Sequence, residues 1–244
     1  MRRASLAHAR ASGAAEEVCR WRRSFSPVRD TVLVAGVGPR IGEATVRTFH
    51  AAGYDVGMFA RSGEFIDDLA ADLGDGALAV ETDVTDEAAV LAGVETVREA
   101  FGPVGALVLN ASGGGGRPFP DASVDRLRSL FDVRVAGSLA CVQAVVDDLR
   151  GTEGTVVFSG TTFADGESPD QVEWGAVAPA ARGLARTLAS ALESVQVTYV
   201  SIGSAVRPEA DAWSIPAESV AETYLDLVER EDAVTRELDL HRRG

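Results

Sequence analysis

The stretch AGVGPRIG, residues 35–42, decides how the rest of this sequence is interpreted. It follows an apolar, β-branched run (TVLVAG, 31–36) and precedes a segment of helical spacing that ends at a glycine (41–53). Glycines between a strand and a helix let the backbone turn tightly and approach a pyrophosphate, whose charge the helix N-terminus stabilises. The stretch therefore predicts a strand–loop–helix unit with a phosphate-binding turn.

Short apolar runs and longer helical patterns alternate from Asp30 to the end of the chain. Near-continuous apolar strands separated by helices indicate a parallel sheet covered on both faces. Right-handed crossovers then give a Rossmann-like, doubly wound α/β fold with seven parallel strands. No internal repeat or linker interrupts the pattern, so we expect a single domain over 30–244. The expected strands are 31–36, 55–60, 77–84, 105–110, 154–160, 195–202 and 236–240; the expected helices are 41–53, 65–74, 86–102, 123–149, one that ends near 192 and one with Pro216 in its first turn.

The charge is distributed unevenly along the chain. All 23 basic residues are arginine, and residues 1–29 carry seven of them against two glutamates. Residues 30–244 contain the other 16 arginines and 35 acids, so this part of the chain is strongly acidic. The net charge of the whole chain is −14. Such a body would be repelled by nucleic acid and by anionic membranes, so neither is an expected partner. The acidity suits a cytoplasm of very high salt, as in a halophilic cell; the alternative is a GC-rich genome that favours arginine over lysine.

Residues 1–29 form a basic segment without the apolar core of a secretory signal, and we expect a disordered extension or a start assigned too far upstream. No run of eighteen apolar residues occurs, so no membrane span is expected. Cys19 and Cys141 suggest neither a disulfide framework nor a metal cluster, which fits a reducing cytoplasm, and the three histidines lack ligand spacing.

Several motifs in order resemble those of the short-chain dehydrogenase/reductase family, over about residues 31–240. The first loop of that family is TGxxxGIG, and this chain keeps Gly36 and Gly42 but has Arg40 at the middle glycine. Asp83 and Val84 end the third expected strand, where the family contacts adenine. The sequence LNAS (109–112) aligns with the NNAG motif of the family, and FDVRVAG (131–137) aligns with its FxVNVxG helix. TRELDL (235–240) resembles its closing strand.

The resemblance implies a bound nicotinamide dinucleotide. Arg61 and Ser62 follow the second strand, where an acid would favour NAD; an arginine there favours NADP(H) over NAD(H) through the 2′-phosphate. Arg40 leaves two alternatives open, because its guanidinium could hold the pyrophosphate or its Cβ could keep the backbone away. The expected cofactor-binding residues are Gly36, Gly38, Arg40, Ile41, Gly42, Arg61, Ser62, Asp83, Val84, Asn110, Ala111 and Ser112.

The same resemblance implies a catalytic tetrad, and this chain departs from it. In the family a Tyr exchanges the proton, a Lys four residues later lowers its pKa, a Ser orients the carbonyl and an Asn supports the Lys. Here Trp174 stands at the Tyr position, Ala178 at the Lys position and Arg134 at the Asn position, while Thr161 keeps a hydroxyl at the Ser position. We therefore expect a degenerate tetrad.

Other residues near these positions are weighed as substitutes. Asp165, Glu167 and Glu173 are candidate proton donors, since a carboxyl of raised pKa can donate a proton. The three tyrosines are expected away from the site, on the approach to the second strand, on the sixth strand and on the last helix. Residues 113–116 (GGGG) suggest a mobile cleft rim or a flexible surface loop. In VEWGAVAPAA (172–181), Pro179 predicts that the helix begins or bends there.

Two functional hypotheses remain open. The first is an NADP-dependent oxidoreductase of a small carbonyl or alcohol with a non-standard proton source. The second is a non-catalytic cofactor-binding sensor, or a structural partner of an active subunit. The expected partners are a nicotinamide dinucleotide, an unknown small molecule and further copies of the chain, as a homo-dimer or tetramer through the small-residue face of 176–191.

Overall fold

The computed structural model describes residues 30–165, 168–208 and 213–242. The basic segment 1–29, and with it Cys19, lies outside the described residues, as does Glu167. A seven-stranded parallel sheet with the order β3-β2-β1-β4-β5-β6-β9 organises the chain, which confirms the predicted doubly wound fold. Its strands are β1 (Thr31–Ala35), β2 (Asp55–Ala60), β3 (Ala77–Glu81), β4 (Val104–Leu109), β5 (Thr155–Thr161), β6 (Gln196–Ile202) and β9 (Glu237–Leu240).

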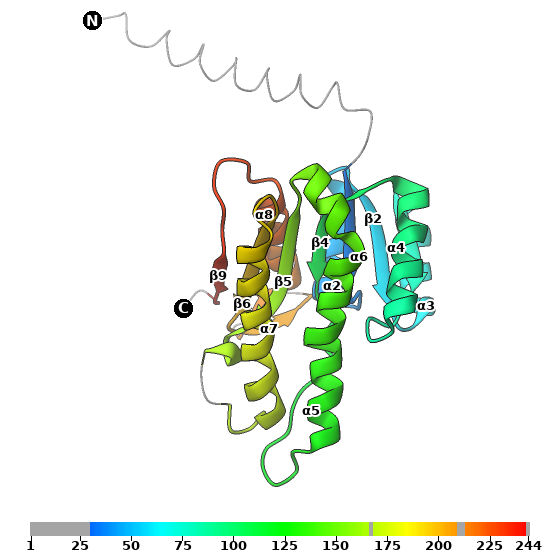
Figure 1. Cartoon of the computed structure of the whole chain (residues 1–244). Coiled ribbons are helices and arrows are strands. Elements are labelled where there is room, and N and C mark those ends of the chain that lie inside the picture. Colours follow the sequence, from blue (N-terminus) through cyan, green and yellow to red (C-terminus); the bar gives the residue numbers. More distant parts are fainter. Residues whose placement is uncertain (1–29, 166–167, 209–212, 243–244) are drawn as a thin grey trace, which may run out of the picture.

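Helices cover both faces of this sheet (Figure 1). The strands are apolar at successive positions because each face has its own core: Leu33 and Ala35 point into one cluster, Val32 and Val34 into the other. The first core joins the sheet to α4, α6 and α7, and the second joins it to α2, α3 and α8. The helices are α2 (Ile41–Ala51), α3 (Gly63–Leu73), α4 (Glu87–Phe101), α5 (Val124–Phe131), α6 (Gly137–Thr152), α7 (Val172–Ala191) and α8 (Ala217–Val228).

The strand order reverses between β1 and β4, which are neighbours although β2 and β3 separate them in the chain. In open α/β sheets a crevice opens beyond the carboxyl ends of the strands at this reversal, and ligands bind there. The loops after β1 and β4 begin at Gly36 and Asn110, so the fold brings two of the quoted motifs together.

Some predicted boundaries are wrong. Strand β3 ends at Glu81, so Asp83 and Val84 lie in the following loop, where Asp83 forms a turn with Thr85 instead of a ladder. Helix α8 begins at Ala217, with Pro216 as its N-cap residue. The two-stranded sheet of β7 (Ala205–Arg207) and β8 (Ser214–Pro216) has no counterpart in the sequence prediction, since three-residue strands are too short to show a period.

Two helices also depart from expectation. Helix α7 begins at Val172, seven residues before Pro179, so the prediction that the helix begins at the proline is wrong. Pro179 is exposed and lies inside the helix, where its missing N–H leaves one carbonyl group of the preceding turn without its usual donor. The expected helix 123–149 contains one π-helical turn, η1 (Asp132–Ala136), between α5 and α6. That wider turn buries two consecutive side chains, Val133 and Arg134.

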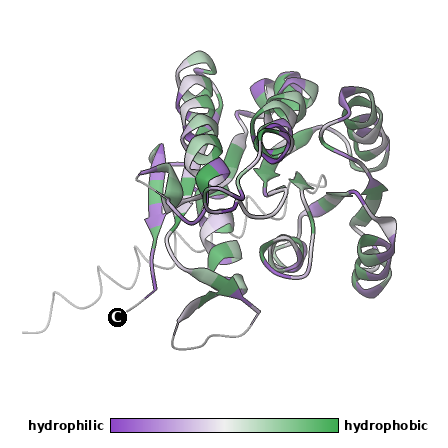
Figure 2. Cartoon of the chain, turned by 90° about the horizontal axis from the view of Figure 1, so that it is seen from below, coloured by the Kyte–Doolittle hydropathy of each residue, from purple (hydrophilic) through white to green (hydrophobic). Residues whose placement is uncertain are grey.

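The helical stretch Val124–Thr152 is, by length and composition alone, apolar enough to cross a membrane, and 56% of its apolar window is buried inside the molecule. Its buried apolar side chains, such as Val142, Val145 and Leu149, pack in the core beside the sheet. Figure 2 shows the molecule from below: the central strands are mainly hydrophobic, and the helices carry both hydrophobic and hydrophilic residues.

Candidate functional site

A cavity of about 840 Å³ lies at the carboxyl ends of the central strands. All twelve predicted cofactor-binding residues line it, and so do Thr161, Trp174 and Arg134. Ala178 is the exception: it is fully buried in a cluster with Leu130, Trp174 and Val177. The structure therefore brings the residues predicted from separate motifs into one continuous cavity.

The glycine loop after β1 is shaped for close approach of a ligand. Gly36 has a φ of +102°, which side chains rarely tolerate, and a Cβ there would lie 2.2 Å from the amide nitrogen of Ala111. The side-chain amide of Asn110 donates to the carbonyl of Gly36 at 2.7 Å and so fixes the turn. Asn110 thus holds the loop in addition to lining the cavity.

The N-terminus of α2 faces this cavity with amide groups that have no partner. The amides of Ile41 and Gly42 make no hydrogen bond within the described chain, whereas the Glu43 amide donates to the carbonyl of Gly38. Two free N–H groups at a helix N-terminus are suited to binding a phosphate. Arg40 is exposed and also lines the cavity, so its side chain can swing without displacing the loop.

Arg61 and Ser62 line the cavity beyond the end of β2. The Arg61 guanidinium is exposed and makes no ion pair or hydrogen bond within the part of the chain that the structure describes. In the loop after the neighbouring strand β3, the carboxylate of Asp83 accepts hydrogen bonds from the amide and the hydroxyl of Thr85, at 3.0 and 2.8 Å. This end of the cavity therefore has an exposed cation after β2 and a hydrogen-bonded carboxylate after the neighbouring strand β3.

The inner end of the cavity contains three of the four positions of the expected tetrad. The indole of Trp174 is 8% exposed, and its Nε1 donates to the carbonyl of Gly114 at 2.6 Å. Thr161 caps the short helix η2 (Thr162–Ala164), where its hydroxyl oxygen accepts from the Phe163 amide at 3.4 Å. Arg134 lies with its guanidinium 5.2 Å from the centre of the Trp174 ring. An indole and a threonine can orient a ligand here, but neither is an acid suited to proton transfer near neutral pH.

Glu173 anchors the loop 113–123. One carboxylate oxygen accepts from the Arg117 amide at 2.7 Å, and the other accepts from the Ser123 amide at 2.9 Å. The Ser123 hydrogen bond lowers the pKa of Glu173 below its ordinary value, and the Arg117 bond acts in the same direction. A carboxyl held ionised in this way is a poor proton donor, so the interpretation of Glu173 as a substitute acid is not supported.

The tetraglycine loop is bound on several sides. The Gly116 amide donates to the Gln171 side chain at 2.7 Å, and the Arg126 guanidinium donates to the carbonyls of Gly113 and Gly115. With the bonds from Glu173 and Trp174, these contacts hold the whole rim against the start of α7. The predictions of a mobile rim and of a flexible surface loop are therefore wrong, because the loop is held by hydrogen bonds along its length.

The expectation that the tyrosines lie away from the site is wrong for two of them. The hydroxyl of Tyr224 donates to the Ser159 hydroxyl at 2.7 Å, and the Tyr199 hydroxyl accepts from the Thr161 amide at 3.1 Å. Tyr199 reaches β5 from the neighbouring strand, and Tyr224 reaches it from α8. Both rings are fully buried, and burial raises the pKa of each phenol. They therefore support β5 as neutral groups behind the cavity wall.

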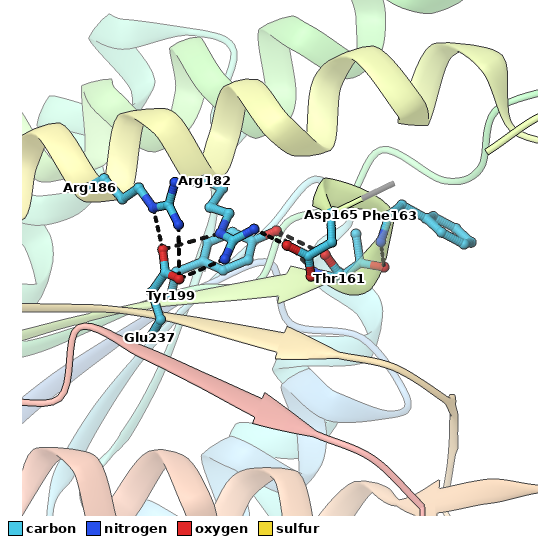
Figure 3. A network of polar contacts seen from close by, with 7 residues as sticks. All are labelled: Thr161, Phe163, Asp165, Arg182, Arg186, Tyr199 and Glu237. Carbon is cyan, nitrogen blue, oxygen red and sulfur yellow. Dashed lines mark hydrogen bonds and ion pairs between the residues drawn. The ribbon is translucent and has the colours of Figure 1, made fainter. Parts of the chain in front are cut away.

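Asp165, the other described candidate for a substitute acid, belongs to an ion-pair network (Figure 3). Arg182 on α7 pairs with Asp165 and with Glu237 on β9, and Arg186 pairs with the same Glu237. The hydrogen bonds from Arg182 and Arg186 lower the pKa of Glu237 to about 2. These ion pairs connect α7 to strand β9 and to the segment after Thr161. Asp165 is therefore paired with Arg182.

Further residues at the ends of two strands also line the cavity. Ser159 and Gly160 belong to the end of β5, and Ile202, Ser204 and Val206 follow or end β6. The general rule that ligands bind at the carboxyl ends of parallel strands identifies the first two and Ile202, whereas the fold alone places Val206 on β7. No cluster of metal-ligating side chains occurs among the described residues.

The fold and this cavity define the class of doubly wound α/β proteins with a glycine-lined cavity at the strand reversal. The family model of the short chain dehydrogenases matches residues 30–208. The chain therefore belongs to the short-chain dehydrogenase family, which confirms the resemblance drawn from its motifs.

Relatives and solved structures agree with this assignment. The chain is 32% identical over 146 residues to a meso-2,3-butanediol dehydrogenase of Serratia marcescens, covering 59% of this chain and 56% of that relative. It is 24% identical to the oxidoreductase asL5 of Sarocladium schorii, covering 84% and 82% of the two chains. The chain thus spans little more than half the length of the Serratia relative.

Two solved structures share the fold. An alcohol dehydrogenase of Thermococcus sibiricus complexed with 5-hydroxy-NADP superposes with a TM-score of 0.81 at 22% identity, covering 88% of this chain and 99% of that chain. A 3-ketoacyl-(acyl-carrier-protein) reductase of Brucella melitensis complexed with NADH gives 0.79 at 22% identity, covering 87% and 97%.

Proposed function

We propose that the cavity binds a nicotinamide dinucleotide, with NADP(H) preferred over NAD(H). The pyrophosphate would lie against the free amides of Ile41 and Gly42, beside the close-approach turn at Gly36. The unpaired guanidinium of Arg61 would hold the 2′-phosphate of NADP through charge-assisted hydrogen bonds. When bound, the nicotinamide supplies or accepts hydride.

We further propose that this member of the family lacks the standard proton transfer. This proposal rests on the residues that occupy the Tyr and Lys positions of the family, Trp174 and Ala178. The indole N–H of Trp174 is committed to Gly114, and Ala178 is a fully buried methyl group outside the cavity wall. Glu173 and Asp165, the described alternatives, are engaged as structural anions.

The function that fits best is a cofactor-binding protein, either a sensor of the nucleotide or the structural partner of an active subunit. One observation favours the second candidate, a slow NADP-dependent oxidoreductase of a small carbonyl or alcohol. The Thr161 side chain lines the inner cavity, where its hydroxyl can orient a carbonyl group. Positioning without an acid or base would forgo roughly 10²–10⁴ in rate.

The proposed cofactor preference is tested by equilibrium titration of the full chain with NADPH and with NADH in high salt. Arg61→Gln is expected to weaken NADPH binding about ten-fold or more, the effect of losing a charge-assisted hydrogen bond, and to leave NADH binding unchanged. Arg128→Gln, on the exposed face of α5, is the matched control. Equal losses for both nucleotides would refute the role of Arg61, and binding of neither nucleotide would refute the cofactor site.

The assembly and the environment are also proposals. The exposed side of α7 carries small residues, Ala176, Pro179, Gly183 and Ser190, which permit close approach of a second helix. We propose a homo-dimer or tetramer through this face, in a cytoplasm of high salt. Light scattering of the purified chain distinguishes these assemblies from a monomer.

A further inference from the structure

Arg134 is a buried cation without an acidic partner. It is 6% exposed, and its two terminal nitrogens donate to the carbonyls of Ala111 at 3.1 Å and Ser159 at 2.7 Å. Its Nε is buried and makes no hydrogen bond. No ion pair to Arg134 occurs within 30–165, 168–208 and 213–242, and burial lowers the pKa of its guanidinium.

Of the three partly buried arginines among the described residues, two are paired with acids, and the third, Arg126, donates to backbone carbonyls. Arg98 holds Asp148 at 2.8 Å, and Arg182 holds Glu237 at 2.7 Å. The part of the chain after residue 29 has 35 acids for 16 arginines, so acids are abundant. None of the acids that the structure describes pairs with Arg134, the most deeply buried guanidinium of the described residues. Because an unpaired buried charge is strongly disfavoured, such groups are retained mainly where an opposite charge binds.

The position of Arg134 provides that opportunity. It lines the cavity together with Thr161, and its guanidinium lies over the Trp174 ring. A guanidinium has five N–H donors, of which two are used here, so donors remain for a planar anion. Two peptide carbonyls could be bound by a neutral amide; they do not explain a full charge.

We propose that the inner end of this cavity binds a small organic carboxylate, with Arg134 as the residue that binds its charge. The inference deepens the proposed function, since it takes the cavity to be a ligand site, and it names the class of the second ligand. The Thr161 hydroxyl hydrogen, which no described residue accepts, supplies a second donor. Trp174 supplies the apolar wall for the remainder of the molecule.

The test is calorimetric titration of the full chain with 2-oxobutyrate and with its neutral counterpart 2-oxobutanamide. Each titration is made with the free chain and with the chain saturated with NADP⁺, which cannot reduce the ligand. The native chain is expected to bind the acid at least about ten-fold more tightly than the amide, as for a charge-assisted hydrogen bond. Arg134→Gln is expected to remove this preference, and the control Arg128→Gln is expected to retain it.

Equal affinity for acid and amide in the native chain would overturn the inference, and so would a preference that survives in Arg134→Gln. Arg134→Lys keeps the positive charge and replaces Arg134→Gln in the test if that variant does not fold. The Arg134→Lys variant is expected to retain a weaker preference for the acid. Loss of the acid preference in Arg134→Lys would count against the inference. The two proposals fail separately. Absence of NADP⁺ binding with the acid preference intact refutes only the cofactor site; NADP⁺ binding without that preference refutes only the carboxylate site.

Discussion

Replacing Gly36 by alanine is expected to destabilise the fold strongly, whereas the same change at Gly38, two residues later, is expected to be nearly neutral. A Cβ on Gly36 would lie 2.2 Å from the nitrogen and 2.4 Å from the Cα of Ala111, and both are backbone atoms. A Cβ on Gly38 would have no neighbour within 4 Å. The two positions therefore form a matched pair within one loop.

The magnitude follows from two effects. A side chain at positive φ costs about 1–2 kcal/mol, and forcing extra volume against packed backbone costs about 1–3 kcal/mol more. Gly36→Ala should thus lower the free energy of unfolding by about 2–5 kcal/mol. For a chain of this size, each kcal/mol lowers Tm by roughly 2–4 °C. The expected fall is therefore between about 4 and 20 °C, against less than about 2 °C for Gly38→Ala.

Thermal unfolding of both variants, followed by circular dichroism in the same high-salt buffer, measures this difference. Two results would refute the reasoning: equal Tm values for the two variants, or a Gly36→Ala variant as stable as the native chain. Either would mean that the turn after β1 does not approach the loop after β4 as closely as described.

Three further outcomes are expected. Glu173→Gln should speed hydrogen–deuterium exchange at the Arg117 and Ser123 amides, because an amide side chain cannot accept from both; the exposed Glu222→Gln should not, and equal exchange would contradict the anchoring role. The pKa of Glu237 is lowered from 4.5 to about 2, so its stabilisation is present above pH 4.5 and is lost as the pH falls towards 2. Glu237→Gln should therefore lower the free energy of unfolding by about 1 kcal/mol at neutral pH and by less near pH 2, and a loss independent of pH would contradict the network. If the net charge of −14 reflects salt adaptation, Tm should rise steadily with KCl concentration, whereas a flat response favours the genomic explanation.

The sequence predicts the sheet well because its strands are buried on both faces. The run VLVA is apolar at every position because Leu33 and Val34 point into different cores. Such a continuous apolar run differs from the helical segments, whose apolar residues recur at helical spacing. The cavity was predictable for the same reason: parallel strands end at one edge, so the motifs after β1, β2, β3 and β4 must meet there.

The inner site was less predictable because its contacts join residues distant in sequence. Arg134 and Trp174 could be recognised as substitutions, but their stacking depends on the π-helical turn of η1, which turns Arg134 inward. A glutamate such as Glu173 can serve as a general acid, so the sequence alone does not exclude that role. The amides of Arg117 and Ser123, which donate to its carboxylate, show that Glu173 holds the loop before α5 in place. The hydroxyls of Tyr199 and Tyr224 reach β5 across sheet and core, a contact that sequence position alone does not reveal.

The central claim, that the chain binds NADP(H) but lacks the standard proton transfer, is tested most directly by measuring NADPH oxidation under saturating NADPH. The purified chain is mixed with NADPH and a panel of aldehydes, ketones and 2-oxo acids in high salt, and the loss of NADPH absorbance is followed. We expect saturable NADPH binding, with NADPH oxidation no faster than in the absence of the chain. Substrate-dependent oxidation by the native chain with many turnovers would contradict it.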